Sequence, residues 1–168
     1  VPDITVAGPK PVAITPDGRC LLDTTQSLAH TPDRRLGGAI KECIADAPVQ
    51  MLYSLWKGTP PSSNQRVSTA AILNSYWDNY YHWILEDLLK VRGVKKYEEI
   101  TGSEVTIIIR SDPPSYVTQS LKILGYSEDD WLEWKGGRLA IDKLVVPSYP
   151  DLTPVTLRWL RTTMTNRL

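Results

Sequence analysis

Three polar residues that could act together on one ligand are spaced as on one face of a helix: Asn79, His82 and Glu86. Residues three and four positions apart lie on one face of an α-helix, so an amide, an imidazole and a carboxylate can converge there. A neutral imidazole accepts a proton from a hydroxyl group, and a carboxylate four residues further on orients the ring. The spacing therefore indicates acid–base chemistry on a hydroxyl group near the start of a helix.

Aromatic residues surround this histidine. Trp77, Tyr80 and Trp83 offer rings that suit the C–H faces of sugars, and Asp87 adds a second carboxylate. On an α-helix Asp87 lies ~100° round from Glu86, which makes Glu86 the better placed acid. Two other interpretations stay open. A polar stripe is usually the solvated side of an amphipathic helix, and aromatic residues at a helix start usually pack in the core, so the pattern alone names no reaction.

The helix that carries these residues has a clear predicted start. Ser75-x-x-Asp78 is a capping-box pattern, and helical periodicity continues from Ser75 to about Lys96. The predicted core face consists of Tyr81, Ile84, Leu85 and Leu88.

Strand and helix patterns alternate around this helix. Arg66–Leu73 precedes it as a strand, and the β-branched run Val105–Arg110 follows as a buried strand. The remaining expected elements are a helix over Pro114–Leu124, strands over Trp131–Trp134 and Leu139–Val146, and an amphipathic helix capped by Thr153-Pro154. This alternation predicts an α/β fold with a parallel sheet and flanking helices.

The first third of the chain has a different character. Residues 1–11 are rich in proline and are expected to form an extended lead-in. Val12–Thr15 and Cys20–Asp23 flank Pro16-Asp17-Gly18, whose turn chemistry predicts a β-hairpin. A weaker helical pattern follows over Asp33–Ala47.

Composition excludes several classes of protein. The 168 residues contain 19 basic and 19 acidic side chains, so no general attraction to nucleic acid or anionic membranes is expected. No apolar run approaches the ~20 residues of a membrane-spanning helix. Cys20 and Cys43 supply too few ligands for a structural zinc site; two free thiols are expected, with a disulfide as the alternative. Without a leader or glycosylation sequon, the sequence favours a cytoplasmic location.

One stretch resembles a family signature. Asn79-Tyr80-Tyr81-His82-Trp83-Ile84-Leu85-Glu86 is similar to the Asn-(Tyr/Phe)-x-His-Trp-x-x-(Asp/Glu) motif of glycosyltransferase family 61. Weaker similarities follow in the family's order at Thr15–Asp23, Ser115–Tyr126 and Ile141–Ser148. The resemblance thus covers roughly Pro11 to Ser148.

The resemblance implies a Rossmann-like, acceptor-side N-terminal lobe of a GT-B-type enzyme. It divides the chain into a β-rich extension (1–64), a Rossmann-like unit (65–150) and a helix (151–168) leading to a C-terminal donor lobe, supplied in cis or trans. Two features depart from the family. The Leu-Pro-Arg that often follows the acidic residue is Leu88-Leu89-Lys90 here, and the Gly-His-Gly-Ala-type motif of the donor lobe does not occur.

The family's chemistry is an inverting sugar transfer from a nucleotide-sugar donor to a glycan or other hydroxyl acceptor. By resemblance, His82 is the base or acceptor ligand, Glu86 its orienter or an alternative base, and Asn79 a positioning residue. The residues expected to contact substrate are Trp77, Tyr80, Trp83 and Asp87. No metal or other cofactor is expected. The alternatives are a non-catalytic glycan-binding module and a purely structural α/β domain.

Overall fold

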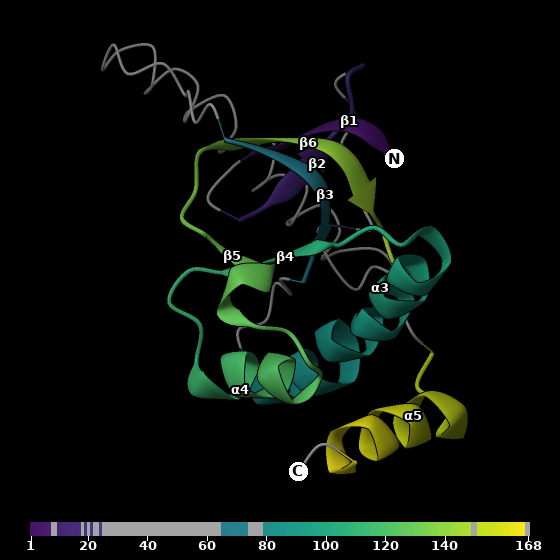
Figure 1. Ribbon diagram of the computed structural model, residues 1–168. Helices are drawn as coiled ribbons and strands as arrows, with labels where there is room; N and C mark the ends of the chain where they lie inside the picture. Colours follow the sequence, from purple (N-terminus) through teal and green to yellow (C-terminus); the bar gives the residue numbers. More distant parts are fainter. Residues whose placement is uncertain are drawn as a thin grey trace, which may run out of the picture.

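The computed structural model describes residues 1–7, 10–17, 19, 21, 24, 65–73, 79–148 and 151–166 (Figure 1). The strands are β1 (Pro2–Ala7), β2 (Val12–Ile14), β3 (Arg66–Ile72), β4 (Thr106–Arg110), β5 (Trp131–Trp134) and β6 (Arg138–Val145). The helical segments are α2 (Tyr80–His82), the π-helical turn η3 (Trp83–Asp87), α3 (Leu88–Thr101), α4 (Ser115–Ile123), the 3-10 turn η4 (Glu128–Asp130) and α5 (Pro154–Thr165).

The strands form one mixed sheet of six in the order β2-β1-β6-β3-β4-β5. The pairs β6–β3, β3–β4 and β4–β5 are parallel, as expected of strands joined through helices. β1 runs antiparallel to both β2 and β6. The α/β class is therefore confirmed, and the six-stranded sheet as a whole is mixed.

The expected extended lead-in is instead strand β1, so that prediction was wrong. Ile4 and Val6 are buried while Thr5 and Ala7 are only partly so, which is the alternation of a half-buried strand. The prolines obscured this pattern, although proline is tolerated at the first residue of a strand, where Pro2 stands.

The predicted turn after β2 is present. The Thr15 N–H donates to the Arg19 carbonyl at 2.9 Å, and the Leu21 N–H donates to the Ala13 carbonyl at 2.8 Å. These bonds turn the chain back on itself around Pro16 and Asp17. Most of the expected second arm, the two cysteines and the expected helix over Asp33–Ala47 lie outside the described residues.

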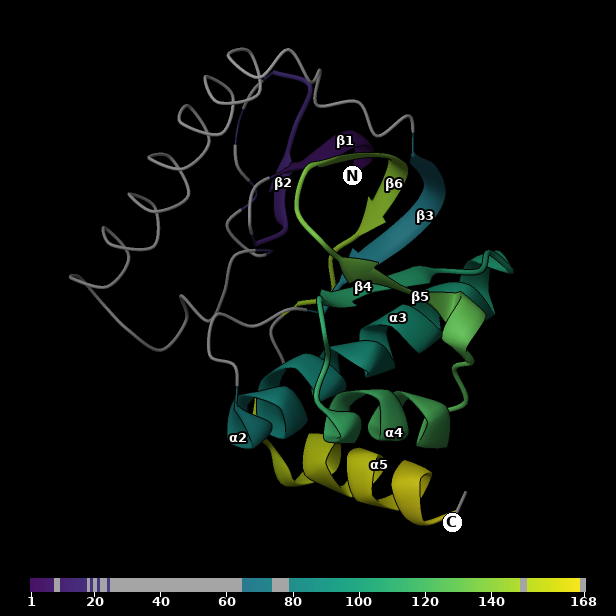
Figure 2. The same ribbon diagram turned by 90° about the vertical axis from the view of Figure 1, so that its left-hand side faces the viewer.

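Both faces of the central strands are buried. Along β4, Ile107 and Ile109 join a core with the helices, whereas Ile108 joins a second core with β1 and β6. Figure 2 shows α3, α4 and α5 on the same side of the sheet. Leu160 of α5 is buried in the core on this helical side.

The helix after β3 starts and ends later than its pattern predicts. Asn79 has the extended backbone of an N-cap (φ −137°, ψ 160°), so the helix begins at Tyr80 rather than Ser75. Residues 74–78, including the expected capping box, lie outside the described residues. The helix continues past Lys96 to Thr101, where Gly102 adopts the left-handed conformation (φ 67°) that ends helices.

We expect Gly93→Ala to destabilise the protein although alanine favours helix by about 1 kcal/mol. A Cβ at Gly93 would lie 2.9 Å from the Cβ of Pro147, an atom fixed in a ring, so α3 or the segment after β6 must shift. Overpacking of this kind costs about 1–3 kcal/mol, so the net free energy of unfolding should fall. Urea unfolding measures this, with Arg92→Ala on the same helix as the control; a raised midpoint for Gly93→Ala would refute the close packing.

Tyr126 should make the protein less stable in alkaline solution. Burial, followed by the charge of Glu98, raises the pKa of the Tyr126 hydroxyl, which donates to Glu98 Oε2 at 3.2 Å. The folded state then holds this proton more tightly than the unfolded chain. Its contribution is complete below the unfolded tyrosine pKa of ~10 and is lost as the pH rises above that value. Tyr126→Phe should flatten this decline between pH 9 and 11 in unfolding experiments, whereas Tyr81→Phe, at an exposed tyrosine, should not.

Candidate functional site

Among the described residues, the predicted site residues lie at the N-cap and in the first turns of one continuous helical run, α2–η3–α3. The second turn is π-helical: the Leu88 N–H bonds to the Trp83 carbonyl five residues earlier. Such widened turns occur mostly as single turns within α-helices and frequently mark functional sites. No local signal predicts this turn, because one widened turn leaves no repeating pattern in the sequence.

His82 and Glu86 lie together as expected. The His82 Nδ1 is 2.8 Å from the Glu86 Oε1, with side chains 23% and 10% exposed respectively. The ring nitrogen lacks the alignment of a hydrogen bond with this oxygen, so the contact is best described as electrostatic. A buried carboxylate at this distance favours one orientation of the imidazole ring.

Asp87 and Lys90 form a second ionic pair one turn further on. The Lys90 Nζ lies 3.2 Å from the Asp87 Oδ1, and the side chains are only 7% and 1% exposed. Buried charges are costly, and few are retained without a paired and hydrogen-bonded arrangement. The second carboxylate is therefore an interior group, so its expected direct contact with substrate is not what the structure displays.

The predicted faces of the helix are displaced. Glu86 and Lys90, expected on a polar face, are buried, whereas Tyr81, expected in the core, is 58% exposed. The π-helical turn places the residues that follow it on different sides of the helix, relative to those before it, from the sides that an unbroken α-helix would give them.

Asn79 acts on the helix start. Its Oδ1 accepts the His82 backbone N–H at 3.1 Å, which satisfies one of the otherwise unpaired N–H groups at a helix N-terminus. The predicted amide therefore lies beside His82 in space. It holds the backbone of His82 in place.

The aromatic residues divide into two groups. Trp83 is 5% exposed, and its indole N–H donates to Ser120 Oγ at 2.8 Å, so it joins the helix to α4 and does not offer a ring face to a sugar. Tyr80 is 60% exposed and meets Tyr116 edge to face, with ring centroids 5.2 Å apart. Tyr81 lies edge to face with the His82 ring at 5.3 Å. Trp77 lies outside the described residues.

Tyr80, Tyr81 and Tyr116 are called here the tyrosine surface: Tyr81 contacts the His82 ring, and Tyr116 contacts Tyr80. Tyr116 belongs to α4 and its approach to Tyr80 places the starts of α2 and α4 side by side. Sequence reasoning missed Tyr116, since no spacing rule connects two helices that follow different strands.

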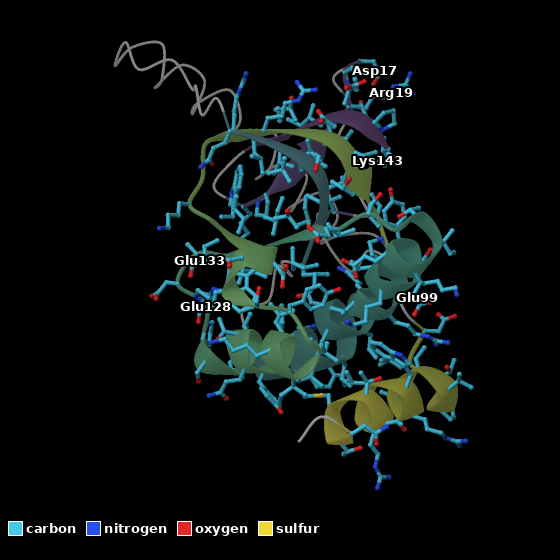
Figure 3. All side chains as sticks on the ribbon, in the orientation of Figure 1. Asp17, Arg19, Glu99, Glu128, Glu133 and Lys143 are labelled. Carbon is cyan, nitrogen blue, oxygen red and sulfur yellow. The ribbon has the colours of Figure 1, made fainter. Side chains whose placement is uncertain are left out.

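A cavity of about 600 Å³ lies elsewhere, along the edge strand β5. Its lining comes from separate segments and consists of Gln65, Thr118, Lys122, Glu128, Trp131, Leu132, Glu133, Trp134, Lys135, Gly136 and Arg138. Figure 3 shows two of its acidic residues, Glu128 and Glu133, close to α4 and β5. Neither His82 nor Glu86 lines this cavity. Sequence reasoning singled out none of its lining residues as functional, because they come together only in the fold.

Two further points concern the described residues. No group of three His, Cys, Asp or Glu side chains there is arranged to hold a metal ion. None of the helices in the described ranges has the length and apolar character needed to cross a membrane.

Together the described residues define an α/β protein with a mixed sheet. A π-helical turn near the start of its central helix carries the acidic members of two ionic pairs. Comparison of the chain with protein-family models, with curated proteins and with solved structures gave no match.

Proposed function

We propose that this chain is the Rossmann-like, acceptor-side lobe of an inverting, GT-B-type glycosyltransferase. The observation that carries the proposal is the 2.8 Å contact between His82 Nδ1 and Glu86 Oε1, on a π-helical turn bordered by the tyrosine surface. The resemblance of residues 79–86 to the motif of glycosyltransferase family 61 supports the same assignment.

The contact suits a base that acts on a hydroxyl group. With its Nδ1 side towards Glu86, the imidazole takes the acceptor's hydroxyl proton at Nε2. The acceptor oxygen bonds to the anomeric carbon as the bond from that carbon to the nucleoside diphosphate breaks, so the diphosphate leaves with the electron pair. A donor lobe, in cis or trans, holds the nucleotide sugar, and the tyrosine surface holds the acceptor sugar.

Glu86→Gln tests this arrangement. The substitution keeps the size of the side chain but removes the charge beside His82, so we expect turnover to fall at least ~10-fold because the imidazole loses the carboxylate that orients it. Release of nucleoside diphosphate by the full-length protein, with a panel of nucleotide sugars and glycan acceptors, measures the effect. Glu104→Gln changes an exposed carboxylate on the same chain and should have no effect. Equal rates for Glu86→Gln and the wild-type protein would remove the proposed mechanism.

A glycan-binding module is the second candidate, and the exposure of Tyr80 and Tyr81 favours it. Exposed aromatic rings suit sugar binding whether or not chemistry follows. Titration of the protein with glycans in the absence of donor separates the two functions. Saturable binding that Tyr80→Ala weakens, without turnover when donors are added, would support the binding module over the transferase.

A further inference from the structure

The cavity along β5 is separated from the His82–Glu86 pair by helix α4. Thr118 and Lys122, one turn apart on α4, line the cavity, whereas Ser120 accepts the Trp83 indole N–H. Residues two positions apart lie on nearly opposite sides of a helix, so α4 faces the cavity on one side and the candidate site on the other. Its volume of about 600 Å³ lies within the ~300–1,000 Å³ of small-molecule sites.

The charges that line the cavity do not cancel. Lys122 Nζ contacts Glu128 Oε1 at 2.6 Å, and this hydrogen bond lowers the pKa of Glu128, so the pair stays ionised and balanced. Glu133 Oε2 accepts the Asp112 N–H at 3.3 Å. Lys135 and Arg138 are exposed and make no ion pair with other residues in the part of the chain that the structure describes.

The two cations have a defined position. They flank Gly136 and Gly137, whose φ angles of 81° and 98° are readily adopted only by glycine, so the backbone turn between β5 and β6 places both residues in the cavity lining. Trp131, half-buried, adds an indole to the same lining. Cations and an aromatic ring in one lining suit a ligand that carries an anionic group and an apolar ring face. The cations bind the anionic group, and the indole packs against the ring face.

We propose that this cavity binds an acidic saccharide, through a carboxylate or phosphate group held by Lys135 and Arg138 and a sugar ring beside Trp131. The saccharide part rests on the proposed function, in which a glycan is the acceptor. The ligand class is thereby an acidic saccharide rather than a neutral one.

Isothermal titration of the full-length protein with three probes tests the proposal: tri-galacturonate, neutral galactotriose and glucose 6-phosphate. We expect tri-galacturonate or the sugar phosphate to bind at least ~10-fold more tightly than galactotriose. The affinity for the acidic probe should fall as the salt concentration increases. The tighter of the two acidic probes identifies the anionic group. The double variant Lys135→Gln/Arg138→Gln should lose this preference. Its affinity for the acidic probe should be at least ~10-fold lower than that of the wild-type protein.

Lys143→Gln is the matched control, because it removes an exposed cation of β6 that Figure 3 shows away from Glu128 and Glu133. Equal affinity for acidic and neutral probes, absence of saturable binding, or an unchanged double variant would each overturn the proposal. Failure of the proposed transferase function is distinguishable: the acidic probe would then still bind at the cavity, and would do so in His82→Ala, while no sugar transfer occurred.

Discussion

Replacing His82 by alanine is expected to reduce sugar transfer by about 10²–10⁴-fold, the usual contribution of a general base. The imidazole is the proposed proton acceptor, and Glu86 beside it cannot reproduce its position on the helix. The fold should persist, because the ring is partly exposed and the neighbouring Trp83 keeps its bond to Ser120.

The measurement is turnover under saturating donor and acceptor, together with urea unfolding to confirm stability. Arg92→Ala, an exposed change on α3, serves as control. A variant at His82 that retains the wild-type rate would exclude the histidine as base.

Removing the carboxylate of Asp87 is expected to be the most destabilising single change at the site. Asp87→Ala removes the carboxylate that lies 3.2 Å from the buried Lys90 ammonium. Removing one partner of a buried ion pair costs about 3–5 kcal/mol. Urea unfolding at neutral pH measures the loss. Asp129→Ala removes an exposed carboxylate and should change stability by less than ~0.5 kcal/mol.

The double variant Asp87→Leu/Lys90→Met separates charge from packing. Replacing both partners by apolar side chains of similar size leaves no buried charge, so most of the lost stability should return. A double variant that is no more stable than Asp87→Ala would show that Lys90 depends on other contacts more than on Asp87.

Several elements were predictable from local chemistry. β5 has the predicted bounds, and β3 and α4 fall within a residue or two of theirs. Thr153 caps α5 and Pro154 follows at the first helical position, as the local residues indicated. These signals are short-range, because capping, turn residues and β-branched runs act within a few positions of the chain.

Other features depend on contacts between distant segments. β1 became a strand because Ile4 and Val6 pack with Ile108 and Ile141, and the extended first residues offered few internal cues. The same holds for Trp83, whose burial is decided by Ser120, 37 residues later.

At the candidate site the division is clear. Spacing alone brought His82 and Glu86 together, because residues four apart meet on any helical turn. The burial of Asp87 and Lys90 was decided by tertiary structure. The physical reason is that the periodicity of a helix shows only which residues share a face. Whether that face is buried or exposed depends on how the sheet and the neighbouring helices pack against it.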